Sequence, residues 1–311
     1  MRTPQQAVVD YLSLRRSLGF KLEKHEVCLR EFVSFLKKRG TSRITTKLAL
    51  QFATQHQRQQ PAEWAVRLSI VRGFACYRSG VDPATEIPPQ GLLPNRPARA
   101  QPYLYSEDEI RRLLTAAKNL SSSICSLRPR THYCLLGLLV VTGMRLGEAM
   151  NLQLQDVDWS EGLLTIRNTK FGKSRLIPLH PSTQKILAEY AKHRDRFFAG
   201  RPVQHFFVSS RGNHLDKGDI HRTFYTLSRQ IGLRAPSASR GPRLHDFRHR
   251  FAVQTLLRWY RRGEEPERRL PILSTYLGHS HVTDTYWYLT NTPELMTAAG
   301  KLMEKRWKGV I

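Results

Sequence analysis

The sequence is poor in cysteine and in acidic residues, and it has no long apolar stretch. Its 311 residues include four cysteines, none in a CxxC pair and none with histidines at zinc-finger spacing, which argues against a disulfide framework or a zinc finger. No stretch approaches the about eighteen apolar residues of a transmembrane helix, and the first residues lack an apolar signal-peptide core. These absences predict a cytoplasmic protein with reduced thiols and no membrane partner.

The common nucleotide- and metal-binding motifs are also missing. Gly172-Lys173-Ser174 resembles the end of a P-loop, but Arg167 stands where that motif requires its first glycine. No GxGxxG sequence occurs. Asp156 and Asp158 lie near Glu161, but a turn or strand entry explains them better than a cation site, because no further ligands are close in sequence. The sequence therefore predicts a protein that uses neither a cofactor nor a metal.

Positive charge is abundant. The chain has 50 Lys and Arg against 25 Asp and Glu, a formal net charge of +25. The excess is shared along the chain, with +10 over residues 1–102 and +15 over residues 103–311. A single basic tail would concentrate the excess in one place, whereas two basic regions fit one extended polyanion. The charge favours double-stranded DNA as a partner over a merely solvated surface, because neutralising phosphates releases counterions.

The spacing of apolar residues predicts two domains. Residues 4–80 show four helical patterns and no strand signal, so residues 1–81 are expected to form a compact helical domain. Six prolines follow within residues 82–102, which predicts an extended linker. Residues 103–311 return to helical patterns, beginning with a Ser106–Glu109 capping box. Two strand-like segments around a turn at Phe171-Gly172 interrupt the helices. The fold class expected is mainly α with a small antiparallel β-sheet.

Residues suited to phosphate chemistry stand in four separate blocks of the second domain. Each block has an ordinary explanation when taken alone: a phosphate contact, a solvated lysine, or two side chains sharing an exposed helix face. The blocks are T142-G-M-R-L-G-E148, N168-T-K-F-G-K173, L244-H-D-F-R-H249 and L277-G-H279 followed by Y286-W-Y288.

In this order the blocks resemble the tyrosine recombinase and phage integrase family over nearly the whole chain. The resemblance implies a helical core-binding domain, a linker and a catalytic domain with a C-terminal helix. It also implies the site residues: Arg145 and Arg248 as the two arginines, Lys170 as the β-hairpin lysine, His245 and His279 as the two histidines, and Tyr288 as the nucleophile.

The chemistry expected from these residue types agrees with the resemblance. Two guanidiniums suit a phosphodiester whose transition state gains charge on its non-bridging oxygens. Tyr288 needs a base or positive surroundings to attack near neutral pH, and His245 is suited to exchange that proton. Lys170 could protonate the leaving 5′-oxygen, and His279 could donate a hydrogen bond to the phosphate. The resemblance implies a site-specific recombinase that works as a homo-tetramer on paired DNA sites through a 3′-phosphotyrosyl link.

Several details depart from the family pattern. Asp284 precedes Thr285 where the family often has two threonines, Thr290 stands where a histidine is common, and the segment containing residues 258–263 is longer than usual. Two other functions stay open: DNA relaxation like that of a type IB topoisomerase, and a non-catalytic DNA-binding regulator on the same fold. Integration, excision and resolution of a mobile or circular element are equally compatible with the sequence.

Overall fold

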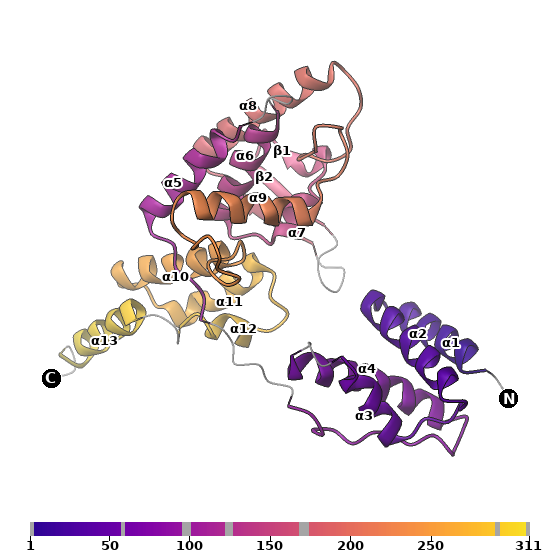
Figure 1. Cartoon of the computed structure of the whole chain (residues 1–311). Coiled ribbons are helices and arrows are strands. Elements are labelled where there is room, and N and C mark those ends of the chain that lie inside the picture. Colours follow the sequence, from indigo (N-terminus) through magenta and orange to yellow (C-terminus); the bar gives the residue numbers. More distant parts are fainter. Residues whose placement is uncertain are drawn as a thin grey trace. The chain divides into compact units, whose positions relative to one another are not determined.

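The chain is mainly helical and carries one small sheet (Figure 1). The computed structural model describes residues 3–56, 60–94, 101–121, 127–167, 174–289 and 293–308. Two compact units are present, Met1–Ala100 and Gln101–Ile311, and each has its own hydrophobic core. The predicted fold class is thereby confirmed. Within the ranges given above, no helix is both long and apolar enough to cross a membrane.

The first unit is built from four helices, as the apolar spacing predicts. Phe32, Phe52 and Phe74 are completely buried in its core. The third helix is capped by Thr45, whose side chain accepts a hydrogen bond from the backbone N–H of Leu48. The helices are α1 (Pro4–Ser17), α2 (Glu23–Lys38), α3 (Thr46–Thr54) and α4 (Pro61–Ser79).

The start of the proline-rich segment contacts this first unit. The backbone N–H of Glu86 donates to the carbonyl of Ile44 at 2.9 Å, and the Arg43 guanidinium donates to the carbonyl of Ala84 at 2.9 Å. Thr85 is buried. These bonds tie residues 84–86 to the loop that precedes α3. The three-part division at residues 81 and 102 stays a prediction.

The second unit consists of nine described helices, a short 3₁₀ turn and a three-stranded sheet. Its first helix begins with the predicted capping box, in which Ser106 and Glu109 exchange side-chain and backbone hydrogen bonds. The helices are α5 (Glu107–Lys118), α6 (Leu127–Thr142), α7 (Leu146–Met150), α8 (Pro181–Phe198), α9 (Lys217–Gln230), α10 (Asp246–Arg261), α11 (Pro266–Leu277), α12 (Thr283–Tyr286) and α13 (Pro293–Lys308), and the 3₁₀ turn is Leu154–Asp156.

The sheet is antiparallel, with the strands in chain order. The predicted hairpin is confirmed: β2 (Leu163–Ile166) pairs with β3 (Arg175–Pro178), so that Ile166 faces Arg175. A third strand, β1 (Val157–Asp158), was not predicted, because two residues are too few to show a period. Lys170, in the sequence between β2 and β3, lies outside the described residues.

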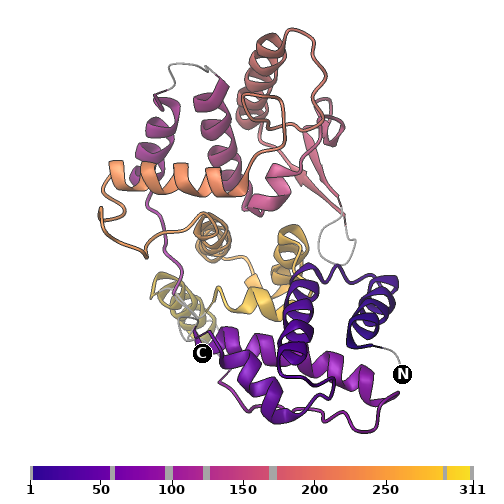
Figure 2. The same cartoon turned by 45° about the vertical axis from the view of Figure 1, so that its right-hand side comes forward.

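Two apolar clusters hold the second unit together. The larger one joins α5, α6, α8, α9 and the sheet. The smaller one joins α10, α11 and the start of α13, and it includes Tyr288. In Figures 1 and 2 the gold and yellow helices α10 to α13 lie together, beside the larger group. The candidate site lies where the two groups meet, because side chains of each bond to the other.

Candidate active site

Arg248 is the deepest charged group of the site. It lies in the first turn of α10 with 2% of its surface exposed, so the alternative of an exposed helix face is wrong. Its guanidinium donates to the carbonyl of Gly143 at 3.0 Å and to that of Leu277. Burial, and next the charge of Arg145, lower its pKa to about 10, while a hydrogen bond with the Tyr288 side chain acts in the opposite direction.

Arg145 lies across the site from Arg248, at the start of the short helix α7. It is the N-cap of α7, and its backbone N–H donates to Glu148 Oε2 at 2.9 Å. Its guanidinium donates to Glu148 Oε1 and to the carbonyl of Gly278, both at 2.9 Å. The side chain stays 35% exposed, so its outer edge can reach an external anion.

Two glycines make these arginine contacts possible. Gly143 has φ +62° and Gly278 has φ +67°, in the left-handed region that favours glycine. A Cβ at Gly143 would lie 2.7 Å from the ring of Phe251. Each glycine offers its carbonyl to an arginine from a distant part of the chain: Gly143 to Arg248, and Gly278 to Arg145. The glycines of the TG-x-R and LGH sequences therefore supply backbone carbonyls that hold the guanidiniums of Arg248 and Arg145, the two arginines called the clamp below.

Tyr288 lies against one of these arginines, Arg248. It is 3% exposed, whereas Tyr286 is 49% exposed. Its ring stacks on that of His279, with centroids 5.9 Å apart and planes 23° apart, and it meets the edge of His249 at 5.3 Å. Its side chain also forms a hydrogen bond with Arg248. The third tyrosine of the region, Tyr276, stacks on Phe251 and also feels the charges of Arg175 and Arg248. Tyr288 differs from it in that its side chain meets both the His279 ring and the Arg248 guanidinium.

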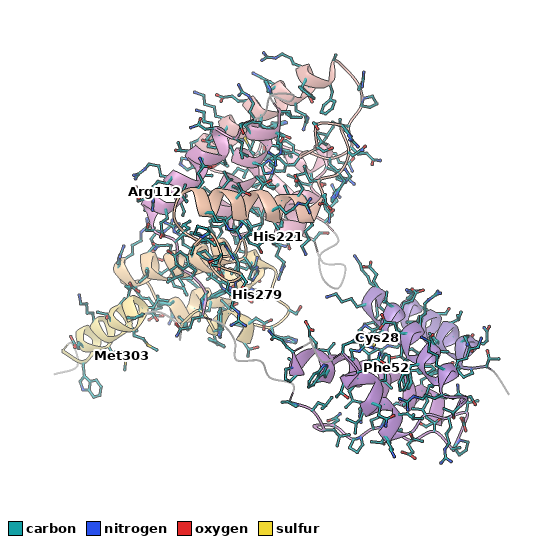
Figure 3. All side chains as sticks on the ribbon, in the orientation of Figure 1. Cys28, Phe52, Arg112, His221, His279 and Met303 are labelled. Carbon is teal, nitrogen blue, oxygen red and sulfur yellow. The ribbon has the colours of Figure 1, made fainter. Side chains whose placement is uncertain are left out.

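Desolvation and neighbouring positive charge lower the pKa of both histidines, although the His245 side chain is exposed at the surface. The pKa of His279 is lowered to about 4 by burial first and then by Arg248 and Arg145, with Asp284 acting in the opposite direction. Its Nδ1 lies 2.8 Å from Oγ1 of the buried Thr285. Burial, and then Arg248, also lower the pKa of His245. Figure 3 marks His279 in the gold region of α11 and α12.

Glu148 and Arg175 join the site although sequence reasoning gave them no role. Both side chains are only 9% exposed, and they form a double hydrogen bond: Arg175 Nη1 to Oε1 at 3.0 Å and Nη2 to Oε2 at 2.7 Å. Arg175 Nε also donates to the carbonyl of Tyr276 at 2.7 Å. Despite burial, the pKa of Glu148 is lowered, by the hydrogen bond and charge of Arg175 and then by Arg145. A carboxylate at N3 of α7 was the one visible signal.

The structure thus gathers five of the six candidate residues from four segments, and Lys170 lies outside the described residues. The five that meet are Arg145, His245, Arg248, His279 and Tyr288.

Comparison with known proteins then decides the family. Residues 104–294 match the sequence profile of the phage integrase family. The chain belongs to the phage integrase family. It is 57% identical to the Sinorhizobium fredii protein y4rB, named as an integrase/recombinase, over 99% of both chains. It is 28% identical to the tyrosine recombinase XerC of Chlamydia caviae, over 91% of this chain and 92% of that one.

A solved structure shows the same fold in this integrase family. The lambda integrase tetramer bound to a Holliday junction resembles the chain with a TM-score of 0.62 and 19% identity, over 92% of this chain and 77% of that one. The family assignment from the four sequence blocks is confirmed.

Proposed function

We propose that this chain is a site-specific DNA recombinase that cuts and rejoins DNA through a 3′-phosphotyrosyl intermediate on Tyr288. The observation that carries the proposal is the contact between a buried tyrosine and a buried arginine, with a second arginine and two neutral histidines beside them. Double-stranded DNA is the substrate, in keeping with the net charge of +25. The enzyme acts in the cytoplasm.

Arg145 and Arg248 bind the scissile phosphate between them. Each guanidinium carries five N–H donors, and Arg248 gives two groups to carbonyl oxygens and one bond to Tyr288, which leaves donors for phosphate oxygens. Because both side chains are fixed by backbone acceptors, they need little reorganisation as negative charge builds up on the phosphate. Their mutual repulsion, which contributes to the lowered pKa of Arg248, is relieved when an anion binds between them.

Tyr288 Oη forms the new bond to phosphorus, and the bond between phosphorus and the 5′-oxygen breaks. His245, whose pKa is lowered, can accept the phenol proton, while Lys170 gives a proton to the leaving 5′-oxygen. His279 donates a hydrogen bond to a non-bridging oxygen. The phosphotyrosyl ester conserves the energy of the broken linkage, so a 5′-hydroxyl can reverse the step without ATP.

Covalent capture tests this function even though the target sequence is open. The protein is mixed with nicked duplexes that carry a randomised insert, so that cleavage releases a short fragment and traps the adduct. We expect SDS-stable protein–DNA adducts whose selected inserts share a sequence, and adduct formation should survive EDTA. Relaxation of supercoiled plasmid with no shared site would favour a topoisomerase, and binding with no adduct would favour a regulator.

The protein acts as a homo-tetramer on paired sites, and α13 supports the assembly. Leu295, near the start of α13, is 2% exposed and packs in the cluster with α10, whereas Met303 and Trp307 are 60% and 69% exposed. A short helix gains little stability alone, so this far end needs a partner surface. We infer that the partner is a neighbouring protomer.

Two kinds of variant test the assembly. Deletion after Thr292 should spare binding of one half-site but weaken cooperative occupancy of paired sites, and recombination should fall more than half-site affinity. Because that deletion also removes the buried Leu295, the double variant Met303→Ser/Trp307→Ser is the sharper test. Gel-shift titrations on one and two half-sites give the comparison, and unchanged cooperativity in both variants would contradict exchange in trans.

A further inference from the structure

Arg175 connects three parts of the site. It is the first residue of β3, and its guanidinium reaches both oxygens of Glu148 in α7 and the carbonyl of Tyr276 near the end of α11. It also fills the space beside Gly278, because a Cβ there would lie 2.8 Å from Arg175 Nη1. One side chain thus links the β2–β3 hairpin, the start of α7 with Arg145 and Glu148, and the end of α11.

Arg175 and the neighbouring Arg145 differ in how far their side chains are exposed to solvent. The Arg145 side chain is 35% exposed, but that of Arg175 is 9% exposed and its three nitrogens already donate to protein acceptors. Arg145 is therefore placed to bind an external phosphate, and Arg175 is placed to bind Glu148. Since Glu148 Oε1 accepts from both guanidiniums, the carboxylate couples them.

We propose that Arg175 is a positioning residue for strand cleavage, which holds Glu148 and, through it, the guanidinium of Arg145. This inference rests on the proposed function. Without Arg175, Glu148 would lose two of its hydrogen bonds, and Oε2, which keeps the Arg145 backbone N–H, could also accept from the Arg145 guanidinium. The two groups would then form a fork, the geometry that a carboxylate and a guanidinium prefer. Arg145 would then turn from the Gly278 carbonyl towards Glu148, and the clamp would lose part of its charge for the phosphate.

The first test compares rates of covalent adduct formation on a captured nicked duplex at saturating protein. We expect Arg175→Ala to slow the cleavage step by about 10- to 100-fold, the size of effect seen when a supporting contact behind a metal ligand is removed. Half-site affinity should stay close to that of the wild type. Arg175→Lys should resemble Arg175→Ala, because an ammonium cannot hold both carboxylate oxygens in this geometry.

Arg194→Ala is the matched control for loss of a buried arginine. Arg194 is 4% exposed, pairs with Asp195 and donates to the carbonyl of Phe206 at 2.9 Å, so its bonds are of the same kinds, but it lies on α8 away from the site. Thermal unfolding of both variants gives the loss of stability. If Arg175 served stability alone, the two variants would slow cleavage equally for equal loss of stability, and that result would overturn the inference.

Modified scissile phosphates then report which group Arg175 acts through. A methylphosphonate removes one negative charge and so reduces the need for Arg145. With it, the rate difference between wild type and Arg175→Ala should shrink, as it should for Arg145→Ala. A 5′-bridging phosphorothiolate has a leaving group that needs no proton, and with it the Arg175→Ala defect should persist.

The double variant Arg145→Ala/Arg175→Ala closes the test. It should cleave no more slowly than Arg145→Ala alone, because the Arg145 guanidinium that Arg175 positions is already absent. Fully additive losses of cleavage rate in the double variant would overturn the inference. Rescue of Arg175→Ala by the 5′-bridging phosphorothiolate would overturn it as well, because that result would show that Arg175 acts through Lys170. If the wild type itself forms no adduct, the proposed function fails; a cleaving wild type with a normal Arg175→Ala refutes the inference alone.

Discussion

The two arginines of the site are held in opposite ways. Arg145 is partly exposed and shares one carboxylate, Glu148, with Arg175, so its charge is only partly offset within the protein. Arg248 is 2% exposed, and among the described residues it bonds to two backbone carbonyls and the Tyr288 side chain, none of them a carboxylate. The α7 turn therefore carries a partly compensated charge, whereas Arg248 at the start of α10 has no carboxylate bonded to it and feels Glu148 only through its charge.

This difference assigns the two sides of the site separate tasks. An uncompensated buried cation is costly by itself, as the lowered pKa of Arg248 shows, and an incoming phosphate anion offsets that cost. The compensated Arg145 gains less from the anion but is oriented before it arrives. Affinity for the phosphate should thus depend mainly on the α10 side, and its orientation on the α7 side.

The largest effect is expected from the nucleophile, which belongs to the α10 side through its bond with Arg248. Tyr288→Phe should abolish the covalent adduct while DNA binding stays nearly intact, because the hydroxyl is lost and the packed ring remains. Adducts are scored on denaturing gels and binding by gel shift. Tyr286→Phe, at an exposed position, is the control. Loss of the adduct in the control and not in Tyr288→Phe would show that the wrong tyrosine has been assigned.

Alanine variants of the two arginines should separate activity from stability. Each should lose cleavage by about 10² or more, the order found when one oxyanion donor is removed. Arg248→Ala should also destabilise the fold by about 1 to 3 kcal/mol, since it leaves the carbonyls of Gly143 and Leu277 unpaired in the interior.

Arg145→Ala should instead cost about 1 kcal/mol or less, because the side chain is partly exposed and Glu148 keeps Arg175. Urea unfolding of both variants gives the two values. Equal losses would remove the contrast between a compensated and an uncompensated arginine. Arg248→Lys should fail in cleavage as well, because an ammonium cannot reproduce the fork.

A smaller effect is expected on the titration of His279, the group that senses both arginines. Its pKa is lowered to about 4, and Arg248 contributes more to this than Arg145 does. Removing either positive charge should raise the pKa, and Arg248→Ala should raise it more. Imidazole chemical shifts followed by NMR between pH 3 and 8 give the values, and a larger rise in Arg145→Ala would contradict the order.

The same titration affects stability. A histidine whose pKa is lower in the folded state than the ordinary 6.5 or so resists protonation there, so the unfolded chain binds more protons at intermediate pH. Stability should therefore be unaffected by this group above about pH 6.5 and should fall as the pH drops from there towards 4. His279→Gln should show a shallower fall, on the order of 1 kcal/mol less after allowance for solvent.

Sequence periodicity predicted most of the fold because most elements are long and amphipathic. The four helices of the first unit, the Ser106 capping box and the hairpin were all expected from local patterns. The two-residue β1 was missed, since it has no period of its own and exists only by pairing with β2. The contacts of residues 84–86 with the first unit were missed because proline content predicts extension and not packing.

The candidate site was found through its sequence blocks and not through its contacts. Arg145, Arg248, His279 and Tyr288 each stand in a block whose spacing is specific to the family. Glu148 and Arg175 stand 27 residues apart, and nothing local to either shows that they form a pair. Burial was equally hidden: His245 and Arg248 are one turn apart, yet one is exposed and the other is inside, because the carbonyls that receive Arg248 come from other segments.

The hydrogen bonds from Arg248 to the Gly143 carbonyl and from Arg145 to the Gly278 carbonyl also determine when the enzyme can become active during synthesis. Arg248 binds a carbonyl 105 residues earlier, and Arg145 binds one 133 residues later, so neither half of the clamp closes locally. At about 5 to 20 residues per second, a nascent chain that has just exposed Arg145 remains several seconds away from Gly278 and Tyr288. Until then the emerging polypeptide is basic enough to adhere to DNA but has no means of breaking it.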